Sequence, residues 1–199
     1  MKMLLPLFIF ASISCTQAQD VMTEELPYSQ IPDYPEDYSP GNVIARMIDG
    51  LGYRYYWATE GLTEKDLNFS PSSDARNAFS TLKHIHGLSE TILNAPLQQA
   101  NIRPTDRPEL TFEELRRETL LNLKKASDLL RGKSKEDIAE YPIVFQRGER
   151  KSEFPFWNML NGPLADALYH TGQIVSFRRS SGNPMDPNVN VFLWKNRDD

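Results

Sequence analysis

The chain of 199 residues has one cysteine, Cys15, and that residue lies in a segment that we expect the mature protein to lose. A single cysteine can form no disulfide within the chain. Cleavage behind Cys15 would also exclude a cysteine-ligated zinc site and a cysteine nucleophile from the mature protein. The stability of the fold must therefore come from its hydrophobic core.

Long apolar runs are also scarce, and the clearest one lies at the N-terminus. Residues 3–13 are almost wholly apolar and follow the positively charged Lys2. This pattern is typical of a secretory signal peptide, and the run is too short to span a bilayer as an anchor. Small residues at Thr16 and Ala18 place the cleavage site after Ala18. We therefore predict a signal peptide over residues 1–18 and an exported, periplasmic or secreted protein.

Cys15 allows a second interpretation of the same segment. Ser12-Ile13-Ser14-Cys15 resembles a weak lipobox, in which the mature chain would begin at Cys15 and carry a lipid anchor there. Ser12 stands where leucine is usual, which favours ordinary cleavage after Ala18. Both interpretations place the protein outside the cytoplasm.

Positive charge is in short supply, with 22 Lys and Arg against 27 Asp and Glu. Loss of residues 1–18 removes one lysine and no acid, so 21 basic and 27 acidic residues remain, for a formal charge of −6. A surplus of negative charge argues against nucleic acid or an anionic membrane surface as the main partner.

Helical periodicity dominates the rest of the chain, which we divide into an extended lead-in over residues 19–38 and a helical domain over residues 39–199. In that domain, apolar residues recur every three or four positions, as amphipathic helices require. The four stretches that show this pattern are residues 39–59, 74–93, 111–132 and 156–181. They predict an all-α fold, a four-helix bundle with long crossover connections.

The ends of these stretches carry capping signals. Ser73 is suited to cap the second helix, and Thr111 with Glu114 forms a capping box ahead of the third. In the fourth stretch, the Gly162-Pro163 step must either start the helix or kink it, because proline has no amide proton.

Two segments have the character of strands. Residues 143–154 hold an apolar start, a turn at Arg147-Gly148 and a polar return to Phe154, which predicts a short β-hairpin. Residues 189–193 alternate between apolar and polar, and they fit either a short strand or a cover over the helices.

Histidine is rare, so its positions are informative. Of the three histidines, His170 lies four residues after Asp166 on the fourth predicted helix. This spacing puts both side chains on one face of the helix, where they could hold two adjacent positions of one divalent ion. Imidazole and carboxylate together suit Zn, Ni, Fe or Mn. The same spacing also fits a plain hydrogen bond on a helix surface.

His84 or His86, on the second predicted helix, could supply a third ligand. Both lie at the edge of the apolar stripe that defines the buried side of that helix, so helical geometry does not choose between them. The stripe consists of Phe79, Leu82, Ile85, Leu88 and Ile92. A structural interpretation, with one histidine buried and hydrogen-bonded and the other solvated, fits the pattern as well.

Two motifs together resemble the DinB-like superfamily of four-helix metal-binding proteins. They are Leu82-Lys-His84-Ile85 and Asp166-x-x-x-His170-x-Gly-Gln173-Ile174. In that family a histidine precedes an apolar residue on the second helix. Two more histidines lie four apart on the last helix, the later one just before Arg-Gly-Gln-Ile. The resemblance spans about residues 40–182 and implies that His84, Asp166 and His170 bind the metal, with His86 as a neighbour.

This sequence departs from the family pattern at two positions. Asp166 replaces the earlier histidine of the last helix, and Thr171 replaces the usual arginine. Aspartate remains a competent ligand and makes the site harder and more negative. Gln173, one turn beyond His170, is placed to support that ligand from behind. Arg178 and Arg179, in the last turn of the helix, are expected to oppose the helix dipole, and the alternative is that they hold a substrate anion.

The resemblance also implies a function. Family members form homodimers in many cases, and they transfer low-molecular-weight thiols or hydrolyse small substrates. Export disfavours thiol transfer, since such thiols are scarce outside the cytosol. We therefore expect an exported protein that binds one divalent metal and acts on a small-molecule substrate as a hydrolase or transferase, with its catalytic residues unassigned. The alternative is a non-catalytic module of the cell envelope, with the same fold, that dimerises or binds a ligand.

Overall fold

The computed structural model describes residues 25–104 and 108–197. The predicted signal peptide, the alternative anchor at Cys15 and the first part of the lead-in lie outside the described residues. The longest elements of the structure are four helices. They are α1 (Pro40–Thr59), α3 (Ala78–Asn94), α4 (Phe112–Leu130) and α7 (Ala165–Ser181).

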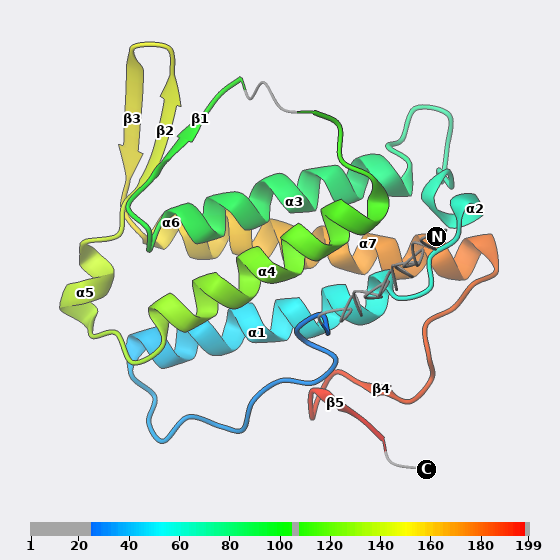
Figure 1. Ribbon diagram of the computed structural model, residues 1–199, viewed down its shortest axis with the longest axis horizontal. Helices are drawn as coiled ribbons and strands as arrows, with labels where there is room; N and C mark the ends of the chain where they lie inside the picture. The colour runs from blue at the N-terminus through cyan, green and yellow to red at the C-terminus, as the bar shows by residue number, and fades with distance from the viewer. Residues whose placement is uncertain (1–24, 105–107, 198–199) are drawn as a thin grey trace, which may run out of the picture.

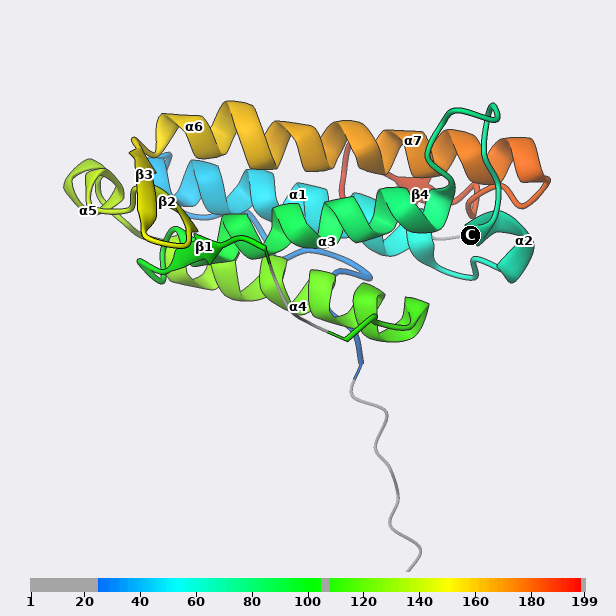
Figure 2. The ribbon, with the colours of Figure 1, turned by 90° about the horizontal axis from the view of Figure 1, so that it is seen from above.

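Each long helix packs against two of the others, because α1 and α3 both contact α4 and α7 (Figure 1). Seen from above, α3 lies between α4 and α7 (Figure 2). Aliphatic side chains from all four helices fill the space between them, as the helical spacing of apolar residues predicts. The fully buried ones include Ile48, Leu51, Leu82, Ile85, Ile92, Leu115, Leu120, Leu123 and Ile174. The chain is thus mostly helical, with a small sheet attached.

The start of α4 confirms the predicted capping box. Thr111 Oγ1 accepts from the amide of Glu114, and the Glu114 carboxylate accepts from the amide of Thr111 at 2.8 Å. The predicted start of α3 was wrong by one turn, since the helix begins at Ala78 rather than Asp74. The side chain of Asn77 caps it by accepting from the amide of Ser80 at 2.9 Å.

The hydroxyl of Ser73, which we expected in the capping role, donates to its neighbour Asp74 instead, at 2.6 Å. The connections contain two short helices that the apolar periodicity did not predict. They are α2 (Glu64–Leu67) and α5 (Lys135–Ala139). Each is opened by a capping box of its own, at Thr63 and Ser134.

The fourth helical stretch contains the kink that Gly162-Pro163 allowed. It starts with α6 (Trp157–Met159) and passes through one wide turn, η1 (Leu160–Leu164), into α7. Gly162 has φ −100° and ψ −105°, outside the helical range, because Pro163 cannot donate an amide hydrogen bond. The turn brings the start of α7 alongside the middle of α3.

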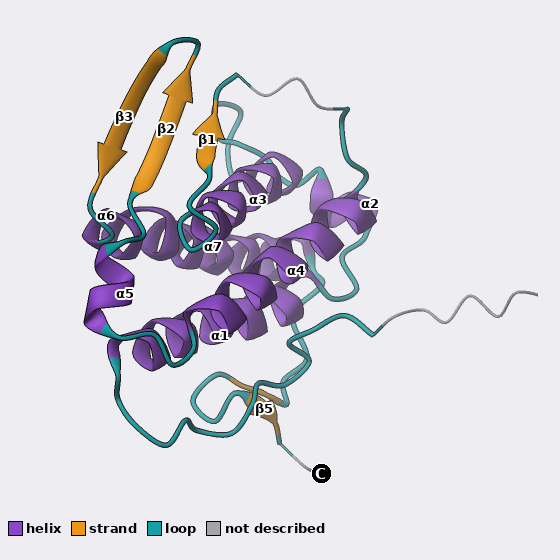
Figure 3. Cartoon of the chain, turned by 60° about the vertical axis from the view of Figure 1, so that its left-hand side comes forward, coloured by secondary structure: helices purple, strands orange, loops and turns teal. Residues whose placement is uncertain are grey.

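A three-stranded sheet stands at one end of the helices (Figure 3). The predicted hairpin is confirmed as β2 (Ile143–Arg147) and β3 (Arg150–Phe154), joined by a turn with Gly148 at φ 59°. A third strand, β1 (Ala100–Ile102), was not predicted and pairs in parallel with β2. In the tail, β4 (Val189–Asn190) and β5 (Lys195–Asn196) form a short antiparallel pair.

The described part of the lead-in is closely attached to the helices. Tyr28 is only 4% exposed, and its hydroxyl donates to the buried carboxylate of Asp49 on α1. Arg131, just past α4, reaches the same carboxylate at 2.9 Å. Among the described residues, none of the helices combines the length and the apolar character needed to cross a membrane.

Candidate metal centre

Three side chains that could bind a metal meet where α3 lies beside α7 (Figures 1 and 2). His84 projects from α3, and Asp166 and His170 project from the first turns of α7. Their chain neighbours Ile85 and Ala167 are fully buried in the core. A step of one residue along each helix turns the polar side chains to the edge of the helix–helix interface.

Asp166 presents one carboxylate oxygen to each of the two imidazole rings. Nε2 of His84 is 3.1 Å from Oδ2, and Nε2 of His170 is 3.3 Å from Oδ1. The ring centres of the two histidines are 4.7 Å apart, and the rings are nearly perpendicular at 84°. One ligand atom from each residue lies within 4.8 Å of the other two.

These separations suit a single divalent ion. Zinc binds imidazole nitrogen at roughly 2.0–2.1 Å and carboxylate oxygen at roughly 2.0–2.2 Å, so adjacent ligand atoms of a tetrahedral site lie about 3.4 Å apart. The distances of 3.1 and 3.3 Å are close to that value. Two nitrogens and one oxygen are also a donor set that Zn, Ni, Fe and Mn accept. The residues present therefore fit the group that the sequence predicts.

Gln173 determines which nitrogen of His170 faces the carboxylate. Its Oε1 lies 2.7 Å from Nδ1 of His170, so Nδ1 carries a proton and donates it. On a neutral ring, Nε2 then presents a lone pair to Oδ1 of Asp166, which has only lone pairs itself. Two such acceptors 3.3 Å apart repel each other unless a cation lies between them. A metal ion, or a second proton on His170, meets that need.

The cluster is open to solvent on one side. The side chains of His84, Asp166 and His170 are 34%, 43% and 16% exposed. Three protein ligands at a partly exposed position leave coordination sites for water or for a substrate, as in catalytic rather than structural sites.

His86 lies on the other flank of α3 and does not join the cluster. It is 8% exposed, and its Nδ1 is 3.2 Å from Oγ1 of Thr119 on α4. Its Nε2 lies 3.5 Å from Glu118 and 3.8 Å from Glu90. The structure thus brings His84 to the Asp166–His170 pair and turns His86 toward α4.

Arg178 lies in the last turn of α7, as predicted, and its side chain also reaches α1. It is 4% exposed, and its guanidinium donates to the backbone oxygens of Trp57 at 2.9 Å and Ala58 at 3.2 Å. It therefore satisfies carbonyl groups at the C-terminal end of α1, which helix geometry leaves without partners, and so joins α7 to α1.

A pocket of about 900 Å³ adjoins the cluster at His84 and extends across α3. Its walls include Gly87 and Leu88 of α3, Pro163 of the kink, and Arg103 in the segment that follows β1. Sequence reasoning missed Gly87 and Arg103 because neither lies in a recognisable motif, and the packing of the sheet against α3 is what brings them together.

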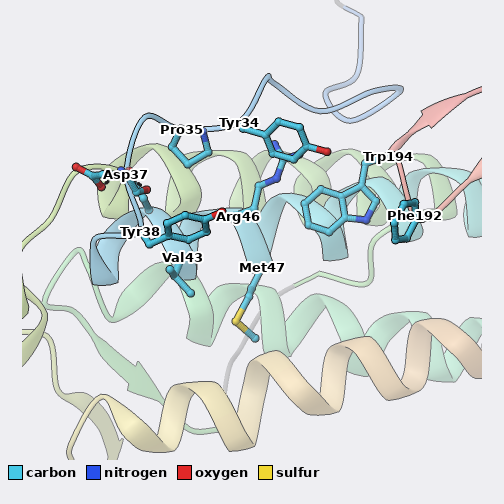
Figure 4. A pocket seen from close by; sticks show the side chains of 10 residues that line it. Tyr34, Pro35, Asp37, Tyr38, Val43, Arg46, Met47, Phe192 and Trp194 are labelled. Carbon is cyan, nitrogen blue, oxygen red and sulfur yellow. Dashed lines mark hydrogen bonds between the residues drawn. The ribbon is translucent and has the colours of Figure 1, made fainter.

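A second hollow, of about 360 Å³, lies between the lead-in, α1 and the C-terminal tail (Figure 4). Four of its ten lining residues are aromatic, and Arg46 lies over the rings of Tyr34 and Trp194, at 4.8 and 4.4 Å from their centres. Asp37 accepts from the side-chain amide of Asn42 at 2.8 Å. Both charged groups of this hollow already have partners within the protein.

Comparison with known proteins leaves the family open: no family model, curated protein or solved structure matches the chain.

Proposed function

We propose that this chain is an exported, DinB-like four-helix protein in which His84, Asp166 and His170 hold one divalent ion. The ion serves the hydrolysis of a small substrate, or the transfer of a group from it. One observation carries the proposal: three potential ligands from two helices converge on a single point, although His84 and Asp166 are 82 positions apart in the chain.

The order of the helices in space supports the family part of this proposal. Consecutive long helices α1 and α3 are not among the pairs that pack together, and neither are α4 and α7, since α1 and α3 both pack on α4 and α7. Two connections must therefore cross the end of the assembly, as a bundle with long crossover connections requires. The hairpin β2–β3 and α5 occupy the connection between α4 and α7, and β1 lies in the connection between α3 and α4.

Each residue has a distinct part in the proposed chemistry. His84 and His170 offer Nε2, Asp166 offers one or both oxygens, and Gln173 fixes the orientation of the His170 ring. A divalent ion in such a site supplies Lewis-acid polarisation and a water of lowered pKa. The partly exposed side of the cluster and the adjoining pocket give a substrate access to it.

The proposal is tested by metal content and hydrolysis measured together. Purified wild-type protein, loaded with metal and desalted, is compared with an Asp166→Ala variant for bound metal and for hydrolysis of a panel of small esters, amides and lactones. We expect one ion per wild-type chain, little in the variant, and activity that a chelator abolishes. A wild-type protein that keeps no stoichiometric metal would refute the proposal.

A non-catalytic module of the envelope is the second candidate, and one observation favours it. Three large apolar side chains of α6 and the first turns of α7 are exposed: Trp157 at 75%, Tyr169 at 65% and Leu168 at 44%. The ring of Tyr169 lies against His170, with the ring centres 5.3 Å apart. Large exposed apolar side chains are candidates for a surface that meets another protein. Stoichiometric metal without hydrolysis, together with a dimer in light scattering, would favour this candidate.

A further inference from the structure

The guanidinium of Arg103 lies in the pocket beside His84 and has no partner among the described residues. A Cβ atom added to Gly87 would lie 3.9 Å from Nη2 of Arg103. The guanidinium therefore lies against α3, one turn beyond His84. No carboxylate within the described parts of the chain forms an ion pair with it, and its side chain makes no hydrogen bond there. The other lysine or arginine of this pocket, Lys83, is paired with Glu109 at 2.9 Å.

The backbone holds Arg103 in this place. Its amide donates to the carbonyl oxygen of Gln146 at 2.8 Å, which extends the pairing of β1 and β2 by one residue. Gly87 has no side chain, so the space above this turn of α3 stays open. A half-buried guanidinium fixed over an open helix surface, without an anion, is arranged to receive one.

We propose that the substrate of the metal site carries a carboxylate and that Arg103 binds it. This inference rests on the proposed function, because it takes the cluster at His84 as the place where the substrate reacts. Arg103 is then a specificity-determining residue. Residues three apart on a helix have Cβ atoms roughly 5–6 Å apart, which puts the guanidinium on the order of 10 Å from the cluster.

The charges around the pocket favour a carboxylate over a phosphate. Arg103 offers one positive charge, and the carboxylates of Glu90 and Glu118 line the side of the same pocket that faces His86. A group with a single negative charge matches the guanidinium in a planar, two-point contact. A doubly charged phosphate gains no second unpaired cation among the described residues, because Lys83 is paired with Glu109, and both glutamates repel it.

A series of chelators with and without a terminal carboxylate tests the inference. The monohydroxamates of succinic, glutaric, adipic, pimelic and suberic acid are compared with the corresponding terminal amides, by calorimetry on metal-loaded protein. The hydroxamate end binds the metal equally in each pair. At the chain length that reaches Arg103, we expect the acid to bind about tenfold more tightly than its amide, since a hydrogen bond between charged groups contributes on that scale.

Variants identify the cation responsible for the difference. Arg103→Gln should remove the advantage of the acid and leave the affinity of the amide unchanged, while Arg103→Lys should keep part of it. Lys83→Gln, which removes the paired cation of the same pocket, should keep all of it.

Metal content, measured first on every sample, separates the two proposals. Full metal with no advantage of the acid at any length in the wild type overturns the role of Arg103 and leaves the metal site standing. Tighter binding of the acid than of its amide that persists in Arg103→Gln also overturns the role of Arg103 and leaves the metal site standing. A wild-type protein without metal overturns the proposed function, and this inference with it.

Discussion

Nε2 of His84 lies 3.1 Å from Oδ2 of Asp166, and the same carboxylate turns its other oxygen to His170. The carboxylate thus joins α3 to α7 at the edge of their interface, beside the buried side chains of Ile85 and Ala167.

Gln173 should strengthen metal binding without touching the metal. Its Oε1 accepts from Nδ1 of His170 at 2.7 Å, and loss of such a partner costs roughly 10–100-fold in metal affinity. Gln173→Ala should therefore weaken zinc binding by at least about tenfold in a competition assay with a chromophoric chelator. Ser176→Ala, an exposed change on the same helix, is the control. Equal affinities of the two variants would show that Gln173 does not support the ligand.

The contact between Tyr28 and Gly52 should not tolerate a methyl group. A Cβ on Gly52 would lie 2.4 Å from Cδ2 of the buried tyrosine ring, so the ring or the helix must move. Overpacking of this kind costs about 1–3 kcal/mol in the free energy of unfolding. Urea denaturation of Gly52→Ala measures it.

Gly172→Ala is the matched control for that experiment, because no atom lies within 4 Å of the added Cβ. An alanine in this exposed helical position should raise the free energy of unfolding by roughly 0.5–1 kcal/mol. If both variants change the free energy of unfolding by the same amount, the close packing of Tyr28 against α1 does not stabilise the fold.

The buried carboxylate of Asp49 should depend on its partners. It is 0% exposed and accepts from Tyr28 at 3.1 Å and from Arg131 at 2.9 Å. Removal of one partner of a buried pair costs about 3–5 kcal/mol, so Arg131→Met should lower the free energy of unfolding on that scale. Lys124→Met breaks an exposed pair with Asp128 and should cost less than about 1 kcal/mol. If both variants lose similar free energy of unfolding, the ion pair of Asp49 with Arg131 stabilises the fold no more than an exposed pair does.

Asp66 should make stability depend on pH in the acid range. Burial raises the pKa of its carboxyl, but hydrogen bonds from Ser181, Asn183 and Thr63 together hold that pKa well below the usual range. The folded state therefore binds the proton less readily than the unfolded state does. This contribution is complete above the unfolded pKa of about 4 and is lost as the pH falls toward the lower folded value.

Asp66→Asn tests that sign. Unfolding in urea, with a chelator present to keep the metal site empty, should show the variant less stable than the wild type at pH 7. The difference should narrow as the pH falls below about 4. A difference that is the same at pH 3 and pH 7 would mean that ionisation of Asp66 does not stabilise the fold.

The helices and the hairpin could be predicted from the sequence because their signals are local. The capping box of Thr111 and Glu114 and the apolar spacing of each helix depend on residues within one or two turns. The predicted start of α3 was wrong because Ser73 and Asn77 are both suitable N-cap residues. Only the folded structure shows which of them the helix uses.

The site was predictable in part. A spacing of four placed Asp166 and His170 on one face, but the choice between His84 and His86 depends on which flank of α3 meets α7. That is a tertiary property, and both histidines lie at the edge of the apolar stripe. Arg103 was missed for a similar reason, because its position follows from the parallel pairing of β1 with β2, more than forty residues along the chain.

His84, rather than His86, completes the proposed metal site. Isothermal titration of zinc into metal-free His84→Gln and His86→Gln, both checked for helical content by circular dichroism, distinguishes the two histidines. We expect one site per chain with wild-type affinity in His86→Gln and a loss of at least about tenfold in zinc affinity in His84→Gln. Loss of zinc binding in His86→Gln with unchanged binding in His84→Gln would contradict this assignment.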